Sequence, residues 1–296
     1  EETFVFWSQG PSATETDKCD NAEIAIKKAI DANENLSALD ISVFAQGSFK
    51  ARTNIRQESD VDVCVRYNKE FFPEYPDGTS EATFGNVDGS LRYADFKDMV
   101  EKALRGRFGD YGVKRGNKAF DVHANTYRID ADVVPTFEHR RYTGRKDTAG
   151  GWEYWSGVAF LPDSGGLIKN WPQQNYANGV SRNNETGRQY KRAIRILKHL
   201  QNRMKIEGVV EASNIPSFLI ECLVWNSEPA AYSHATYSED VRQLIINMWN
   251  ATKNDESCGK WVEVNRLKWL FHPSQPWTRV QVHSFMHAAW NYIGFK

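Results

Sequence analysis

The chain lacks a net charge, a paired set of cysteines and a long apolar run. Among its 296 residues, 37 Lys and Arg nearly balance 38 Asp and Glu. Without a global positive field, we expect no long nucleic acid as a partner. The cysteines have no paired spacing, which argues against a zinc knuckle or a disulfide framework and predicts reduced thiols partly in the core. They are Cys19, Cys64, Cys222 and Cys258.

Membrane-directing segments are also missing from the sequence. No apolar run approaches the length that spans a bilayer, and no basic leader opens the chain. We therefore expect a cytoplasmic protein with no membrane partner. A chain of this length can bury a large core and usually forms one large or two moderate domains.

Two carboxylates spaced two residues apart are the most informative feature that is present. Asp60 and Asp62 alternate with Val61, Val63 and Val65. An extended strand would place both acids on one face and the valines on the other. An isolated Asp-x-Asp pair usually marks the solvated face of an edge strand, so the interpretation depends on what surrounds it.

The segment before the acids favours a phosphate site. Gly47 and Ser48 follow an apolar strand expected at 42–45, and a polar loop over 50–58 leads to Ser59, which opens the acidic strand. Backbone N–H groups of a Gly-Ser turn can bind phosphate, and acids held side by side repel unless a cation lies between them. The combination predicts Mg²⁺ ions that bridge a nucleoside triphosphate.

A third acidic position comes from the segment 128–135. There Asp130 and Asp132 alternate with Ile129, Ala131 and Val133, so both acids share one face of another strand. Three carboxylates on adjacent strands could hold two Mg²⁺ ions. Such a pair can bind the attacking and leaving oxygens of an in-line phosphoryl displacement.

Hydrophobic periodicity predicts an α+β lobe followed by a helical lobe. We place a catalytic domain at 1–165 and a helical domain at 166–296, with the active site in the cleft between them. In the first domain we expect helices at 17–36 and 93–108, strands at 113–124, 127–136 and 153–161, and an exposed loop at 143–151. In the second we expect helices at 189–204, 216–225, 238–252 and 282–293.

These motifs resemble the nucleotidyltransferase superfamily and, within it, the CD-NTases, relatives of cyclic GMP-AMP synthase and of bacterial DncV. The resemblance rests on Gln46–Ile55, Ser59–Val63 and Ile129–Pro135. Asn170-Trp171-Pro172 and the stretch Tyr190–Lys198 look most like the bacterial members that make cyclic dinucleotides or trinucleotides. The likeness runs roughly from Asp17 to Asn226 and implies a polymerase-β-like mixed-sheet lobe with a helical C-terminal lobe.

The resemblance implies roles for the acids and for the turn. Asp60, Asp62 and Asp132 would hold two Mg²⁺ ions, for which Mn²⁺ can substitute, and Asp132 would also be a candidate proton acceptor. Asp130 departs from the family position, and we treat it as structural. Nucleotide binding would use the turn residues Gln46, Gly47 and Ser48.

Further nucleotide contacts are implied in the second lobe. Lys198 would contact the triphosphate, and Ser217 would bind phosphate at a helix N-terminus. Phe218 would stack on a base, although relatives commonly carry Tyr there. For Lys198 the alternative is a solvated basic helix face, and for Phe218 it is core packing.

Base choice would involve Asn170, whose amide can pair with a base edge through donor and acceptor. Some bacterial relatives with Asn in this region accept pyrimidines, so uridine incorporation is one hypothesis. The alternative is an Asn that caps the turn beside Trp171.

The predicted function is a Mg-dependent, template-independent nucleotidyltransferase. It would join nucleoside triphosphates into a cyclic di- or trinucleotide second messenger, release pyrophosphate and serve anti-phage signalling. A regulatory protein partner, a downstream effector of the product and a monomeric state complete the expectation. The alternatives are a transferase that makes linear oligonucleotides or modifies a protein or RNA end, and an inactive nucleotide-binding module.

Overall fold

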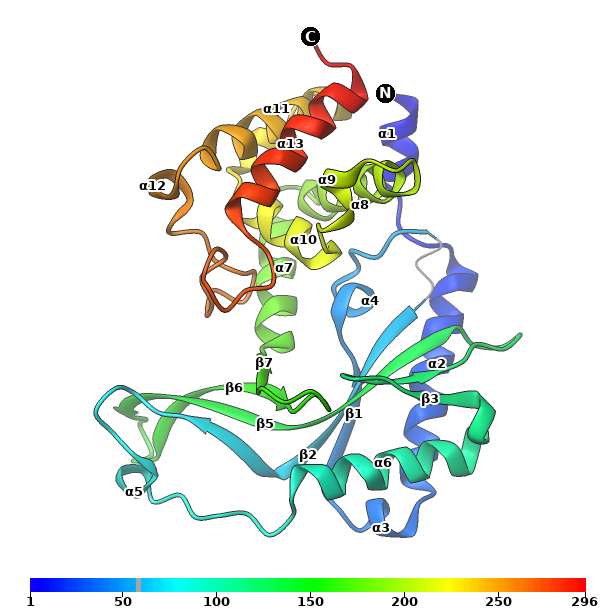
Figure 1. The fold of residues 1–296 in the computed structure, drawn as a ribbon, viewed down its shortest axis with the longest axis vertical. Helices are drawn as coiled ribbons and strands as arrows, with labels where there is room; N and C mark the ends of the chain where they lie inside the picture. Colours follow the sequence, from blue (N-terminus) through cyan, green and yellow to red (C-terminus); the bar gives the residue numbers. More distant parts are fainter. Residues whose placement is uncertain (57–59) are drawn as a thin grey trace. The chain divides into compact units, whose positions relative to one another are not determined.

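The computed structural model describes residues 1–56 and 60–296 and forms two compact units, which we consider separately (Figure 1). Of the described residues, the sheet unit contains 13–49 and 60–173, and the helical unit contains 1–12, 50–56 and 174–296. The division therefore differs from a single boundary after residue 165. Two short segments from the first part of the chain pack in the helical unit. Ser59, which opens the predicted acidic strand, lies outside the described residues.

A mixed sheet organises the sheet unit. Its order is β1-β2-β5-β4-β3, and β6 pairs with both β5 and β7. β2 and β5 are parallel, and the other pairs are antiparallel. The strands in the described part of the chain are β1 Ile41–Ala45, β2 Asp60–Glu74, β3 Val113–Arg115, β4 Phe120–Val122, β5 Asp130–Lys146, β6 Trp152–Phe160 and β7 Ile168–Asn170.

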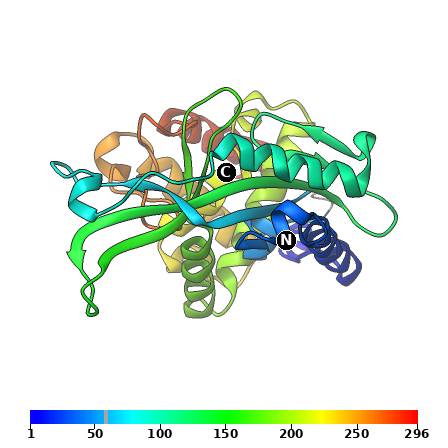
Figure 2. The ribbon, with the colours of Figure 1, turned by 90° about the horizontal axis from the view of Figure 1, so that it is seen from below.

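Two long helices cover one face of this sheet, α2 Ala13–Asp31 and α6 Tyr93–Phe108 (Figures 1 and 2). Ile26 of α2 and Phe96 of α6 belong to the same buried cluster as Val61 and Val63 of β2. Because side chains alternate along a strand, the β2 acids face away from these helices. The helix at 93–108 is as predicted. The strand expected at 113–124 is instead the antiparallel pair β3 and β4, and the helix expected at 17–36 is α2 followed by α3 Glu34–Ser37.

The strands β5 and β6 extend beyond the helix-covered core as a long hairpin (Figure 2). Here the predicted exposed loop at 143–151 is wrong for its first part, because β5 continues to Lys146 and pairs that residue with Trp152. The Lys146 ammonium also lies 3.6 Å from the Trp152 ring centroid, a cation–π contact that supports the pairing. The small helix α5 Glu81–Phe84 packs Phe84 against Trp152.

The helical unit is built around α8, which presents apolar side chains at helical spacing on its buried side. Four helices were predicted in this region, and all four are present at nearly the expected bounds. The unit also contains α1, α9 and α12, while α7 begins in the sheet unit and was not predicted. The helices are α1 Glu2–Trp7, α7 Pro172–Glu185, α8 Gln189–Ile206, α9 Val210–Ser213, α10 Ser217–Asn226, α11 Tyr237–Ala251, α12 Asp255–Cys258 and α13 Arg279–Ile293.

Two further expectations can be compared with the structure. The four cysteines are free thiols and are buried, as predicted. Within residues 1–56 and 60–296, no helix combines the length and the apolar character needed to cross a bilayer.

Candidate functional site

The parallel pairing of β2 with β5 brings the predicted acids together. Asp60 lies opposite Asp130, and Asp62 lies opposite Asp132. In-register neighbours on adjacent strands project to the same face, so the carboxylates share the face that α2 and α6 leave uncovered. The sequence predicted on which face of its strand each acid lies. The pairing register shows, in addition, which acids are neighbours across the sheet.

The Gly-Ser turn is fitted to the second acid. Gly47 has a φ of +64°, a left-handed conformation that side chains rarely adopt. A Cβ atom built there would overlap the Asp62 carboxylate oxygen and lie 2.9 Å from its Cγ. The Gln46 backbone N–H donates to the Asp62 carbonyl oxygen at 2.9 Å. Glycine is therefore required at position 47 by its conformation and by the close approach of Asp62.

Ser48 belongs to the short helix α4 Gly47–Ala51, so the predicted turn continues into a single helical turn. This helix ends just before Arg52, which also has a positive φ, +54°. A non-glycine residue in that conformation stores backbone strain, and such strain persists only where surrounding contacts hold it.

Asp132 lies in a strongly anionic environment. Burial raises the pKa of its carboxyl, and the charges of Asp60, Asp121 and Asp130 raise the pKa further. The ionised form is therefore disfavoured unless positive charge is supplied. Raised carboxyl pKa values in a cleft of like charges are typical of functional sites.

Asp121 is an additional acid that the sequence interpretation did not single out. It lies on β4, directly opposite Asp132, so that β2, β5 and β4 each contribute one acid to a row. The alternation of Phe120, Asp121 and Val122 was the available signal. It predicted a strand, but it could not identify the neighbouring strand.

Asp130 makes a hydrogen bond to the backbone, which fits the structural role that we expected for it. Its Oδ1 accepts a hydrogen bond from the Ala124 backbone N–H at 2.5 Å. That contact fixes the connection between β4 and β5, so part of its carboxylate is already engaged.

The acids have the donor atoms that a divalent ion requires, but their side chains do not converge on one point. Carboxylate oxygens are the ligands that Mg²⁺ prefers, and the row gathers negative charge around Asp132. However, nowhere among the described residues do three His, Cys, Asp or Glu side chains converge as a metal-binding group. The acids would hold an ion only after their side chains turn toward a common point.

Lys198 occupies a different setting from the one expected of a phosphate contact. Its side chain is fully buried in the helical unit, and its ammonium lies 2.8 Å from a Glu221 carboxylate oxygen. The same oxygen accepts the Thr53 hydroxyl at 2.7 Å. A solvated basic face, the alternative interpretation, is wrong for this residue.

The other predicted residues of the helical unit remain accessible. Ser217 and Phe218 open α10 directly after Pro216, and both are partly buried. The Phe218 ring lies 6.4 Å from the Trp277 ring, centroid to centroid. Phe218 thus packs on the core with part of its ring and keeps the rest exposed, which leaves its stacking role a prediction.

Asn170 ends β7, where it pairs with Val158. A capping Asn would accept or donate a hydrogen bond with nearby backbone, but in the described chain the Asn170 amide has no such partner. The following Trp171 is buried against Gly157, where a Cβ would lie 2.9 Å from the indole Cδ1. The strand and the buried tryptophan therefore hold Asn170, while its amide is available to another molecule.

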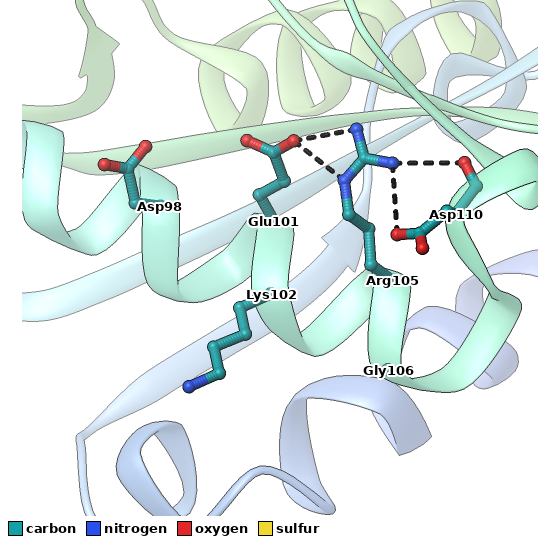
Figure 3. A pocket seen from close by; sticks show the side chains of 6 residues that line it. All are labelled: Asp98, Glu101, Lys102, Arg105, Gly106 and Asp110. Atoms are coloured by element: carbon teal, nitrogen blue, oxygen red, sulfur yellow. Dashed lines mark hydrogen bonds and ion pairs between the residues drawn. The ribbon is translucent and has the colours of Figure 1, made fainter.

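A surface pocket of about 460 Å³ lies elsewhere, along α6 (Figure 3). The Arg105 guanidinium in it lies 2.9 Å from Glu101 and donates to the Asp110 carbonyl oxygen at 3.1 Å. None of the predicted site residues lines this pocket. The Arg105 charge is compensated by Glu101 and Asp110, and the pocket gives no reason to move the candidate site.

Comparisons with known proteins concern the chain as a whole. Residues 177–294 match the model of the cGAS/DncV-like nucleotidyltransferase C-terminal helical domain. The chain is 42% identical to the cyclic dipyrimidine nucleotide synthase CdnE of Legionella pneumophila, over 99% of this chain and 97% of that protein. A protein of the same name from Cecembia lonarensis is 38% identical over 100% and 98% of the two chains.

A solved structure is similar over the full length as well. The CdnE cyclic dinucleotide synthase of Elizabethkingia meningoseptica, bound to GTP and Apcpp, superposes with a TM-score of 0.80 at 33% identity, covering 100% of this chain and 99% of that one. Enzymes of this group generally use divalent metal ions. The chain belongs to the bacterial CD-NTase family of cGAS/DncV-like nucleotidyltransferases, as a cyclic oligonucleotide synthase.

Proposed function

We propose that the protein joins nucleoside triphosphates, without a template, into a cyclic dinucleotide that contains at least one pyrimidine. The observation that carries the proposal is the acidic row on the open face of the sheet, with Asp62 packed against the Gly47 turn. Acids beside a turn that can bind phosphate are suited to phosphoryl-group chemistry.

Three acids, Asp60, Asp62 and Asp132, would hold two Mg²⁺ ions. When bound, the ions neutralise the triphosphate and lower the pKa of the acceptor hydroxyl. Asp132 is the best candidate to take the hydroxyl proton, because burial and neighbouring charges already raise its proton affinity. Most of the rate would come from positioning and charge stabilisation.

Phosphate binding would begin at the Gln46-Gly47-Ser48 turn, whose backbone is fixed by the Asp62 carbonyl oxygen. Ser217 at the start of α10 would bind phosphate, and Phe218 would stack on a base. A second round of the reaction, with the first product as acceptor, would close the ring.

The pyrimidine preference is supported by the Legionella and Cecembia relatives, which are named cyclic dipyrimidine nucleotide synthases. The Elizabethkingia structure, bound to GTP and an ATP analogue, shows that a related chain binds purines. Among residues 1–56 and 60–296, the amide of Asn170 has no hydrogen-bond partner, and it is a group that could read a base edge.

A nucleotide-omission assay tests the proposal. The protein is incubated with Mg²⁺ and four labelled triphosphates, each omitted in turn, and products are resolved after phosphatase and nuclease P1. We expect a phosphatase-resistant product whose formation requires UTP or CTP. Only linear, phosphatase-sensitive products would refute ring closure. A ring that forms without either pyrimidine would refute the base preference alone.

The role of Asn170 has its own variant. Asn170→Ala should reduce the ratio of pyrimidine to purine incorporation by about tenfold, the usual effect of one lost base-edge hydrogen bond. Asn178→Ala is a matched control, because the Asn178 amide donates to the Val264 carbonyl oxygen at 2.8 Å. If both variants change the ratio equally, Asn170 does not read the base.

The product would act as a second messenger on a downstream effector in anti-phage defence, and a regulatory protein partner would control its synthesis. Cells that express this chain together with its effector and its regulatory partner should resist phage, and cells with Asp132→Asn should not. Equal survival of both strains would contradict this part of the proposal.

A further inference from the structure

The outer part of β6 forms an edge of the sheet. β6 pairs with β5 from Trp152 to Ala159, but β7 covers the other side of β6 only at 158–160. In the described chain, no strand pairs with residues 152–157 on that side. This part of the hairpin also projects beyond α2 and α6 (Figure 2). We call residues 152–157 the β6 edge. Backbone N–H and C=O groups along such an edge can pair with a further strand.

The β6 edge lacks the usual features that prevent two edges from pairing. Natural proteins place Pro, Lys or other charges on exposed edges. Residues 152–157 contain neither Pro nor Lys, and Glu153 is their single charged residue. The Glu153 carboxylate accepts hydrogen bonds from the Thr143 hydroxyl at 2.8 Å and from Arg145 Nε at 2.9 Å. Its charge is therefore offset within the hairpin and opposes a second strand only weakly.

Two other edges of the sheet differ from the β6 edge. β2 forms the opposite edge of the hairpin region at 71–74, because β1 pairs with β2 only as far as Tyr67. Pro73 lies there, and it has no N–H to donate to another strand. In β1, every side chain from Ile41 to Ala45 is buried or half-buried. Neither form of protection is present at the β6 edge.

Exposed aromatic side chains occupy the β6 edge. Trp155 is 47% exposed and Tyr154 is 36% exposed. Successive residues of a strand point to opposite faces, so each face presents one of these rings. Tyr154 packs against the Tyr142 ring, with 5.5 Å between the centroids. Large aromatic side chains held on a strand are typical of the centres of protein interfaces.

The position of β7 limits how a second copy of this edge can pair with the first. Because β7 covers β6 from residue 158 onward, symmetric antiparallel pairings are centred on Tyr154 or on Trp155. Centring on Trp155 sets the two Trp155 rings opposite each other and each Glu153 opposite Gly157 of the second copy. The two Glu153 carboxylates are then about 13 Å apart along the strands, whereas centring on Tyr154 halves that separation. Charge therefore favours the pairing about Trp155.

We propose that residues 153–157 are the interface through which two copies of this chain associate, as antiparallel strands about a two-fold axis at Trp155. Each copy occupies the edge of the other, so that assembly stops at the dimer. A second copy fits this edge better than an unrelated strand, because its exposed tryptophan meets another tryptophan and its single charge meets a glycine. The inference goes beyond the proposed function and differs from the monomer expected from the sequence.

The dimer should be weak, because few residues of each copy take part. Interfaces at the low end of the size range are typical of transient association, and we expect a dissociation constant on the order of 10–100 µM. Sedimentation velocity on the full chain, from about 1 µM to about 500 µM, should show monomer giving way to dimer. Monomer throughout this range would overturn the proposal.

A charge at the centre of the interface tests its location. Trp155→Lys should weaken association by about tenfold or more, because the ring pair is lost and two like charges meet at the axis. Trp269→Lys is the matched control, since Trp269 is 54% exposed in the helical unit, and it should associate like the wild type. Thermal melting shows whether both variants are folded. Equal association of the two variants would refute the β6 edge as the interface.

Two opposite charges test the register. Trp155→Lys and Trp155→Glu should each be monomeric alone, but an equimolar mixture should form a heterodimer. Opposite charges attract in this way only if position 155 of one copy lies opposite position 155 of the other. Recovery in the mixture also shows that both variants are folded. A mixture that stays monomeric while the wild type dimerises would refute the pairing about Trp155.

Failure of the proposed function would be distinguishable from failure of this inference. Position 155 lies outside the acidic row, so Trp155→Lys should make as much cyclic product as the wild type at a concentration where both are monomeric. If neither protein makes a cyclic product, the proposed function fails, while sedimentation still decides whether the dimer forms.

Discussion

Charged side chains have opposite surroundings in the sheet unit and in the helical unit. In the sheet unit, Asp132 lies among other acids, and its pKa is raised by burial and by their charges. In the helical unit, Lys198 is fully buried but paired at 2.8 Å with Glu221. A buried charge with a partner holds the fold, whereas a half-buried charge among like charges raises the free energy of the protein without ligand, and a cationic ligand would lower it.

The comparison also explains how the acidic row can persist. Like charges across a sheet are destabilising, yet β2 and β5 are buried on their other face by a large apolar cluster from α2 and α6. Burial of that cluster compensates for the repulsion. The sheet thus supplies stability on one face and leaves reactive groups on the other.

The strongest test of the comparison is Asp132→Asn. This variant should lower product formation by about 10²–10³-fold, because it removes a group that acts on the reacting atoms. Its Tm should be unchanged or higher, since the substitution removes a carboxylate whose ionised form is disfavoured. Product chromatography and thermal melting measure the two effects. The control is Asp130→Asn, which should lower Tm, because it weakens the contact to Ala124, and have the smaller effect on product formation.

The fit of the turn to Asp62 is tested by Gly47→Ala. A methyl group there adopts a disfavoured φ and overlaps the carboxylate, so stability should fall by about 1–3 kcal/mol and activity by about 100-fold. Gly85→Ala is the matched control, because Gly85 has a φ of +70° but nothing within 4 Å of an added Cβ. It carries the backbone strain without the overlap. Equal activity of the two variants would show that the Asp62 contact is unimportant.

The helical unit should lose stability at acid pH, because it contains a histidine whose pKa is lowered. Burial, together with the positive charges of Arg56 and Arg195, lowers the pKa of His199 from 6.5 to about 4. The unfolded chain therefore binds the proton more tightly, and stability is lost as the pH falls from 6.5 towards 4. His199→Phe keeps a ring on Trp7, whose centroid lies 5.7 Å away, and should remove on the order of 1 kcal/mol of this loss. Denaturant midpoints at pH 7 and pH 5 measure it, and parallel losses in both proteins would contradict it.

The smallest effect is expected at an exposed pair. Lys27 and Asp31 lie 2.9 Å apart at i and i+4 on α2, with side chains 57% and 58% exposed. Asp31→Asn should cost at most about 0.5 kcal/mol, because solvent screens the charges. Chemical denaturation at low and at 1 M salt measures this, and a cost that rivals the loss in Lys198→Met, which leaves Glu221 buried and unpaired, would break the contrast between buried and exposed pairs.

Short-range patterns determined much of the fold and part of the site. Alternation along 60–65 and 128–135 fixed which face each acid takes, because successive side chains of a strand must oppose each other. Helical periodicity located α6, α8, α10, α11 and α13, since a sustained apolar stripe has few other ways to be buried. The chemistry of the Gly-Ser turn with paired acids was likewise visible in the chain.

Only the tertiary structure decided which charges meet. The register that sets Asp62 and Asp121 on either side of Asp132 depends on strand pairing, which no local pattern encodes. Lys198 and Glu221 are 23 residues apart, and Thr53 is 168 residues from Glu221. The periodicity of a sequence predicts which way a side chain points, but the partners of that side chain depend on packing between distant segments.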